Sequence, residues 1–191
     1  MTQTETRENT AVLSNYAPPQ LETLALEVLE GKIAVLTIDR PDRMNSMTVK
    51  MFEEFNTVAY ALRDTDARAL VIRGAGERVF CAGFDLDEIG VITEMRVREF
   101  LRFQETATGG LAALHHLPFP VIAAIHGAAS GGGMALALAA DIRLVAPTAK
   151  FNAAAALELE NRGQALLTRC ADMPEALAAF KEKRAPRFTG Q

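Results

Sequence analysis

The sequence predicts an α/β protein in which short buried strands alternate with amphipathic helices. Apolar runs rich in β-branched residues recur along the chain, and stretches with a 3.6-residue apolar period lie between them. Glycine-bearing segments follow two of these apolar runs and precede helical patterns. Strands that alternate with helices favour parallel βαβ units. With 191 residues, the chain is long enough for one domain with a substantial core.

The first predicted elements are a hairpin and a helix. Residues 24–29 and 33–38 are apolar runs separated by Glu30-Gly31-Lys32, which predicts a β-hairpin. After a loop that contains Pro41, an amphipathic helix is predicted from Thr48 to Leu62. Its apolar positions follow the helical period and include Met51, Phe55, Val58 and Leu62.

The middle of the chain continues the alternation. Residues 69–72 are predicted to form a buried strand and residues 94–114 a second helix. Residues 120–125 form the next predicted strand, 133–139 a short helix and 142–146 a further strand. The expected order is therefore β-β-α-β-α-β-α-β.

The two ends of the chain have a different character. Residues 1–20 are polar and lack the apolar core of a secretory signal, so they are predicted to be a disordered arm. Residues 153–170 have a helical pattern, and Asp172-Met173-Pro174-Glu175 resembles a capping box that opens a helix through Phe180.

Composition excludes several classes of function. Apolar residues make up 49% of the chain and charged residues 23%, and the net charge of −4 gives no reason to expect nucleic acid as a partner. Cys81 and Cys170 lie in no metal or disulfide pattern, so we expect no metal site and a reducing cytoplasm as the location. Prolines and glycines interrupt the apolar stretch 117–140, so no membrane span is expected.

The two glycine-bearing segments are the candidate site. They are Phe80–Leu86 and His126–Gly133, and each is expected at a turn from a strand to a helix. Backbone N–H groups at the start of a helix have no intrahelical acceptor and favour negative charge. Two such turns that face each other would make an oxyanion hole, with Phe84 and Gly132 as the donors.

Each candidate also has a structural explanation. The triplet Gly131-Gly132-Gly133 would let a helix pack closely against a strand without any chemical role. Asp85 fits the start of a capping box with Glu88, so it is predicted to be a helix cap more readily than a catalyst.

Ser130 supports a remote alternative. Residues 128–132 are a loose variant of the nucleophile elbow of serine hydrolases. That fold needs its histidine after the serine, whereas His115, His116 and His126 all come before Ser130.

Four blocks, in this order, resemble the crotonase (enoyl-CoA hydratase/isomerase) superfamily. They are Arg40–Met47, Phe80–Leu86, Pro120–Gly127 and Gly131–Asp141. The resemblance covers residues 24–151 and resumes in residues 172–186. It implies a crotonase-like spiral of ββα units over residues 21–152, with C-terminal helices in residues 153–191.

The resemblance also implies a substrate and a site. Phe84 and Gly132 would carry the oxyanion-hole N–H groups, and Arg43, Met44 and Ala82 would line the coenzyme A side. The predicted substrate-binding set is completed by Asp85, Leu86 and Asp87. The substrate would be an acyl-CoA thioester, with coenzyme A as part of the substrate and no separate cofactor. Relatives are usually trimers or paired trimers, so a homo-oligomer is expected.

The sequence departs from the family pattern at two positions. Hydratases of this family carry one glutamate where this chain has Ala135 and a second where it has Ala155. The chain also resembles an internally shortened member after Phe151. The alternative function is therefore a catalytically silent acyl-CoA-binding or assembly subunit, since acid–base catalysis typically contributes a factor of about 10²–10⁴.

Overall fold

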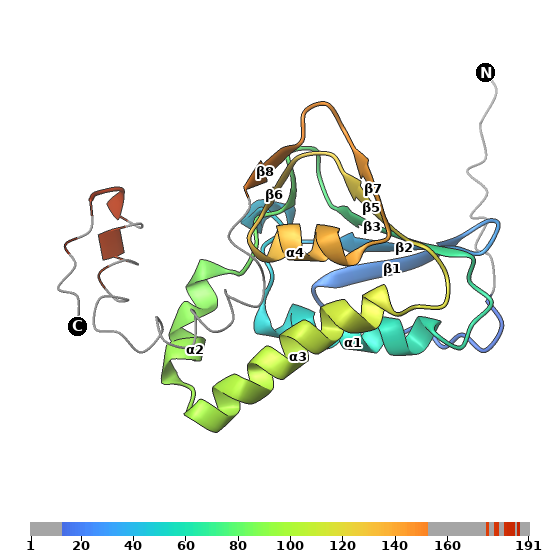
Figure 1. Ribbon diagram of the computed structural model, residues 1–191, viewed down its shortest axis with the longest axis horizontal. Coiled ribbons are helices and arrows are strands. Elements are labelled where there is room, and N and C mark those ends of the chain that lie inside the picture. The colour runs from blue at the N-terminus through green and yellow to red at the C-terminus, as the bar shows by residue number, and fades with distance from the viewer. Residues whose placement is uncertain (1–12, 153–174, 176–177, 180–181, 186, 188–191) are drawn as a thin grey trace, which may run out of the picture. The chain divides into compact units, whose positions relative to one another are not determined.

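A computed structural model (Figure 1) describes residues 13–152, 175, 178–179, 182–185 and 187. The chain divides into two compact units. Among the described residues, the first unit comprises 13–85 and 105–152, and the second comprises 86–104 and those from 175 onward. Both sheets, and the candidate residues Phe84 and Gly132, lie within the first unit.

A five-stranded sheet forms the base of the first unit, with strand order β1-β2-β3-β5-β7. Its strands are β1 (Leu24–Leu29), β2 (Ile33–Ile38), β3 (Ala69–Gly74), β5 (Val121–Ile125) and β7 (Ile142–Val145). β1 pairs antiparallel with β2, and every later pairing is parallel. The predicted hairpin is thus confirmed at its expected residues, and the parallel arrangement follows the predicted βαβ units.

A second, three-stranded sheet has the order β4-β6-β8 and is parallel throughout. Its strands are β4 (Val79–Cys81), β6 (Ala128–Ser130) and β8 (Lys150–Asn152). The sequence did not predict this sheet, because three-residue strands are too short to display an alternating pattern. Each strand follows directly after a strand of the larger sheet, so β3 leads to β4, β5 to β6 and β7 to β8.

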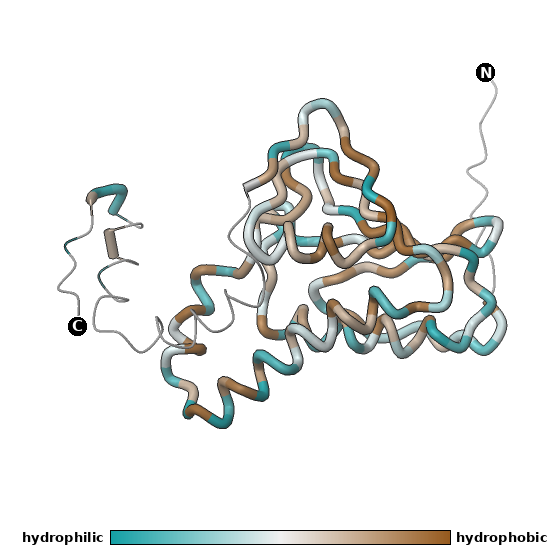
Figure 2. The backbone as a smooth tube through the Cα atoms, in the orientation of Figure 1, coloured by the Kyte–Doolittle hydropathy of each residue, from teal (hydrophilic) through white to brown (hydrophobic). Residues whose placement is uncertain are grey.

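Helices precede the strand pairs and supply much of the core. Thr48 caps α1 (Val49–Leu62), where its hydroxyl accepts a hydrogen bond from the Met51 N–H at 3.1 Å. The short helix α4 (Gly132–Ala139) precedes β7. Figure 2 shows hydrophobic residues concentrated in the strands of the large sheet and in α4. The largest fully buried side chains include Leu36, Ile38, Phe55, Leu70, Ile72, Phe80 and Leu136.

The predicted helix over residues 94–114 is α3 (Val97–His115), which begins three residues later than expected. It is preceded by the 3₁₀ helix η2 (Leu86–Glu88) and the short helix α2 (Ile89–Glu94). The chain is extended at Met95, and the Glu99 carboxylate accepts a hydrogen bond from the Arg96 N–H at 2.7 Å. A glutamate at this position reaches back to the start of its helix, which ends one helix and begins the next.

The predicted disordered arm differs from the structure at its last residues. Leu13 is buried, and the Ser14 N–H and hydroxyl donate hydrogen bonds to the Asp66 carboxylate at 2.8 and 2.9 Å. Lys32 also pairs with Asp66, and its hydrogen bond holds the pKa of this carboxyl at about 2. Residues 1–12 and most of the predicted C-terminal helices lie outside the described residues. No described helix is long and apolar enough to cross a membrane.

Candidate active site

The first candidate turn connects β4 to Phe84 and is fixed by backbone hydrogen bonds to the segment before α1. The Met47 N–H donates to the Gly83 carbonyl at 2.7 Å, and the Asp85 N–H donates to the Met47 carbonyl at 2.8 Å. The carbonyl and the N–H of one trans peptide point in opposite directions. Because the Gly83 carbonyl faces Met47, the Phe84 N–H points away from Met47.

The loop that receives this turn has an unusual backbone. Met44 and Asn45 are both left-handed, with φ of 53°. Asn45 is buried and holds the loop through its side chain, which accepts a hydrogen bond from the Arg40 N–H at 3.1 Å. Its amide nitrogen also donates to the carbonyls of Ala75 and Val79, at 2.9 and 2.8 Å. An asparagine tolerates the left-handed region, and these bonds compensate for the strain at Met44.

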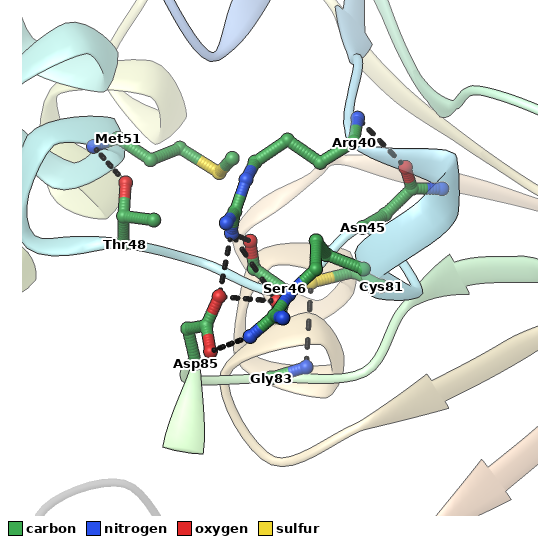
Figure 3. Close-up of polar contacts among 9 residues, drawn as sticks. Arg40, Asn45, Ser46, Thr48, Met51, Cys81, Gly83 and Asp85 are labelled. Atoms are coloured by element: carbon green, nitrogen blue, oxygen red, sulfur yellow. Dashed lines mark hydrogen bonds and ion pairs between the residues drawn. The ribbon is translucent and has the colours of Figure 1, made fainter. Parts of the chain in front are cut away.

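A buried carboxylate lies directly after Phe84 (Figure 3). Asp85 Oδ2 accepts hydrogen bonds from Arg40 Nη1 at 2.9 Å and from Ser46 Oγ at 3.0 Å, and Oδ1 pairs with Arg43 Nη2 at 3.2 Å. The Asp85 side chain is 5% exposed, compared with 21% for Arg40 and 49% for Arg43. The carboxylate is therefore paired as a buried charge requires.

The second candidate turn connects β6 to α4, and its glycines bring backbones into contact. A Cβ on Gly133 would lie 2.2 Å from the Cys81 carbonyl oxygen, and a Cβ on Gly127 would lie 2.2 Å from that of Arg78. Gly131 has a φ of +49° and precedes the first residue of α4, Gly132. Gly132 has no intrahelical acceptor for its N–H because of this position.

The two turns adjoin each other through their glycines. A Cβ on Gly83, which has a φ of +95°, would lie 2.8 Å from the Ser130 carbonyl oxygen and 3.2 Å from the Gly132 nitrogen. A Cβ on Gly132 would lie 3.8 Å from the Phe84 nitrogen and 3.1 Å from Met47 Sδ. The structure thus brings the Phe84 and Gly132 amides to adjoining backbones, although they are far apart in the sequence.

Cys81 lies between the two turns. Its thiol is buried and accepts a hydrogen bond from the Gly83 N–H at 3.5 Å. Desolvation raises the pKa of the Cys81 thiol to about 12, so it is neutral at ordinary pH and is not a nucleophile.

The remaining predicted site residues have different surroundings. Arg43 and Met44 are exposed, and the Ala82 N–H donates to the Met44 carbonyl at 3.1 Å, which places these residues together beside the first turn. Leu86 and Asp87 belong to the second unit, where they begin η2. Their predicted contact with substrate stays a prediction.

The positions that concern acid–base catalysis are only partly described. Ala135 is buried within α4, so this position offers no carboxylate. Ala155 lies outside the described residues. In the described part of the chain, no group of histidine, cysteine and acidic residues could hold a metal ion.

Ser130 and the histidines do not form a catalytic pair. Among the described residues, no hydrogen bond joins Ser130 to a histidine. His115 Nδ1 lies 2.9 Å from the Ala139 carbonyl oxygen, so it contacts the last residue of α4 and not the end of its own helix. Among the described residues, His126 Nε2 is a buried atom without a hydrogen-bond partner.

A cavity of about 920 Å³ opens on the large sheet. Its lining includes Thr37, Asp39, Arg73 and His126, but neither Phe84 nor Gly132. Within this cavity, Arg73 forms an ion pair with Glu27 at 3.1 Å and donates a hydrogen bond to the Thr37 hydroxyl at 3.0 Å. The backbone geometry expected for the oxyanion hole is found at the two turns and not in this cavity.

The sequence did not predict which side chains join the loop before α1 to the first turn. Arg40, Asn45 and Ser46 lie in the block Arg40–Met47, but the sequence pattern predicts no role for their side chains. The partner of Arg40 and Ser46 is Asp85, about forty positions further along the chain. No local pattern predicts a contact at that separation.

Comparison with known proteins agrees with this architecture. The family model described as enoyl-CoA hydratase/isomerase matches residues 29–159. A Rhodobacter capsulatus protein named "Probable enoyl-CoA hydratase" is 40% identical over 129 residues, which cover 68% of this chain and 48% of that protein. The short-chain-enoyl-CoA hydratase of Clostridium acetobutylicum is 36% identical over 133 residues, covering 69% of this chain and 49% of that protein.

A solved structure shows the same relationship. The crystal structure of an enoyl-CoA hydratase/isomerase from Marinobacter aquaeolei has a TM-score of 0.62 and 33% identity, covering 68% of this chain and 50% of that one. The chain spans about half the length of the curated relatives that it matches. By its matching family model, its parallel two-sheet core and its two glycine turns, this chain belongs to the enoyl-CoA hydratase/isomerase family, the crotonase superfamily predicted from its sequence.

Proposed function

We propose that this chain binds an acyl-CoA thioester and polarises its carbonyl through the N–H groups of Phe84 and Gly132. The observation that carries the proposal is the meeting of the two turns. The Phe84 nitrogen lies 3.8 Å from the position that a Cβ on Gly132 would occupy, and the Phe84 N–H points away from Met47. Glycine at position 132 leaves room for a ligand oxygen to approach the backbone.

The chemistry follows from fixed donors. An oxygen that gains negative charge as a thioester becomes an enolate is stabilised by N–H groups held about 2.7–3.1 Å away. These groups are part of the backbone, so they need little reorganisation during the reaction. The named activities of the relatives support an enoyl-CoA as the substrate class, with coenzyme A as part of the substrate.

The coenzyme A portion is proposed to lie beside the first turn. Arg43 and Met44 are exposed there, and Ala82 is hydrogen-bonded to Met44. An arginine and an exposed apolar side chain offer contacts to phosphate groups and to an apolar portion of the same ligand.

A second candidate is acyl-CoA binding without hydration. The observation that favours it is Ala135, a buried alanine in α4 at the position where the family resemblance implies a catalytic glutamate. With neither acid nor base at this position, the oxyanion hole would bind and polarise a thioester without adding water.

Substitution of Gly132 tests the oxyanion hole. Proline is tolerated at the first position of a helix, so Gly132→Pro removes the N–H while leaving α4 able to form. Gly132→Ala keeps the N–H but adds a Cβ 3.1 Å from Met47 Sδ and 3.8 Å from the Phe84 nitrogen, so it measures the effect of crowding alone. We expect Gly132→Pro to weaken transition-state stabilisation in a thioester reaction by about 3 kcal/mol.

Two measurements separate the candidates. Binding of crotonyl-CoA is followed by calorimetry, and its hydration is followed by loss of the enoyl absorbance. Binding without turnover favours the silent candidate, and turnover that falls further in the proline variant than in the alanine variant favours the enzyme. A proline variant as active as the alanine variant would contradict the role of Gly132 N–H.

We also propose that the chain forms a homo-oligomer, as the family resemblance implies. β7 is exposed along its length at the edge of the large sheet, with Ile142 at 47%, Leu144 at 60% and Val145 at 49% exposure. An exposed apolar edge strand favours pairing with another chain. Light scattering tests the proposal, and a monodisperse monomer would contradict it. The cytoplasmic location remains a prediction from cysteine usage.

A further inference from the structure

The charged cluster after Phe84 ties together two segments that are separate in the sequence. Arg40 Nη1 donates to the Ser46 carbonyl at 2.7 Å and to Asp85 Oδ2 at 2.9 Å. Ser46 Oγ donates to the same carboxylate oxygen at 3.0 Å. One guanidinium nitrogen therefore connects the loop before α1 to the residue that follows Phe84.

The cluster complements the backbone bonds on the other side of the same turn. Met47 bonds to Gly83 and Asp85 through the backbone, which fixes both peptides that flank Phe84. The Asp85 side chain adds an anchor to Arg40 and Ser46 (Figure 3). Rotation of the Phe84 peptide would have to break bonds of both kinds.

Burial makes this anchor costlier to break than an exposed ion pair. Asp85 is 5% exposed and Arg40 is 21% exposed, and the carboxylate has a second acceptor oxygen paired with Arg43. Charge-assisted hydrogen bonds in such surroundings are about twice as strong as neutral ones. Removal of one partner leaves the other charge poorly compensated.

We propose that Arg40, Ser46 and Asp85 are positioning residues that hold the Phe84 N–H in the direction needed to receive the thioester oxygen. This inference rests on the proposed function, because it assigns these side chains a role in the same site. None of them needs to contact the substrate. Their effect passes through the peptide between Gly83 and Phe84.

The chain offers a matched control for the cluster. Arg73 also binds a carboxylate and a hydroxyl, at 3.1 Å to Glu27 and 3.0 Å to Thr37, but Arg73 and Glu27 are each 52% exposed and lie on the large sheet. Arg73→Met removes an arginine with the same kinds of partner away from both turns. Arg40→Met and Asp85→Asn remove the two halves of the buried anchor.

The first measurement follows the Phe84 peptide in the absence of substrate. In the 15N-labelled full chain, the backbone order parameter of Phe84 should be near the rigid value of about 0.85 and fall toward about 0.6 in Arg40→Met and Asp85→Asn. It should be unchanged in Arg73→Met. Ser46→Ala removes only the hydroxyl's hydrogen bonds with Asp85 and Arg40, and it gives a smaller fall if the stronger changes unfold the chain. A Phe84 order parameter that stays at the wild-type value in the folded variants would overturn the positioning role.

The second measurement tests the consequence for the site. A conjugated enoyl thioester such as cinnamoyl-CoA changes its absorbance when its carbonyl is polarised, so dissociation constant and spectral shift can be measured together. We expect at least a tenfold loss of the bound spectral shift in Arg40→Met with less than a threefold change in affinity, and partial recovery in Arg40→Lys. Equal losses in Arg40→Met and Arg73→Met would overturn the inference. A wild-type chain that binds the thioester without any shift would contradict the proposed function instead, while the order parameter would still decide the positioning role.

Discussion

The two turns that carry the candidate amides are fixed by different means. The Phe84 turn is held by attraction, through the Met47 backbone and the buried cluster of Arg40, Ser46 and Asp85. The Gly132 turn is shaped by the absence of side chains, because Gly133 and Gly127 let backbones approach within distances that no Cβ would allow.

This difference determines how each turn responds to mutation. Hydrogen bonds and ion pairs can be removed one at a time, and the remaining bonds still fix the direction of the Phe84 N–H. A backbone contact that excludes a Cβ has no intermediate state, since one added carbon forces the strand and helix apart. We therefore expect graded losses at the Phe84 turn and abrupt losses at the Gly132 turn.

The largest effect should come from Gly133→Ala. The added Cβ would lie 2.2 Å from the Cys81 carbonyl oxygen and 2.7 Å from Cys81 Cβ, neither of which can move without shifting β4. We expect the free energy of unfolding to fall by about 3 kcal/mol or more. Urea unfolding measures this loss. Gly90→Ala is the control, because its Cβ meets no atom within 4 Å, and it should leave stability unchanged or slightly higher.

A smaller effect is expected from Asp85→Ala. It removes the hydrogen bonds that the carboxylate accepts from Arg40, which is 21% exposed, and we expect a loss of about 2 kcal/mol in the free energy of unfolding. Chemical denaturation of the variant and the wild-type chain provides the comparison. A loss as large as that of Gly133→Ala would remove the distinction between the two turns.

Alkaline pH should act on Cys81, which contacts both turns. The folded pKa of this thiol is raised to about 12 from an ordinary value near 9, so the folded state favours the neutral form. Its contribution is fully present below pH 9 and is lost as the pH rises from 9 to 12, at about 1.4 kcal/mol per pH unit. Urea unfolding at pH 8 and pH 10 measures the change.

The matched variant for this test is Cys81→Ala, which keeps the Cβ beside Gly133. Its stability should fall less between pH 8 and pH 10 than that of the wild-type chain. Equal falls in the two chains would mean that other groups account for the alkaline loss.

The smallest effect is expected from Glu27→Ala. Glu27 and Arg73 form an exposed pair, and such pairs contribute roughly 0–1 kcal/mol. We expect a change of less than about 0.5 kcal/mol in the free energy of unfolding. A change as large as that of Asp85→Ala would show that burial is not what distinguishes the two clusters.

The sequence predicted those parts of the fold that have a regular apolar period. The hairpin of β1 and β2 appears at its expected residues, and α1 begins at Val49, one residue after its predicted start at Thr48. The second sheet was missed, because strands such as β4 have three residues and no recognisable alternation.

The candidate site was predicted through its backbone features and not through its side chains. Glycines in a turn form a local sequence pattern, so Phe84 and Gly132 could be proposed as donors from the sequence. The bond between Arg40 and Asp85 joins residues far apart in the chain, and its formation depends on the whole fold. Charged residues in a single sequence do not show which partner they will meet.

The alternation of strands between the two sheets limits how a fold of this kind can be lengthened. Each step of the chain places one strand in the large sheet and the next in the small one, as in β5 with β6 and β7 with β8. Insertion of a single strand would add a strand to one sheet and none to the other. Only whole steps, each with a helix and two strands, keep both sheets in register. Gene duplication and deletion would therefore be tolerated in multiples of that step, and engineered chimaeras of related chains should be joined at its boundaries.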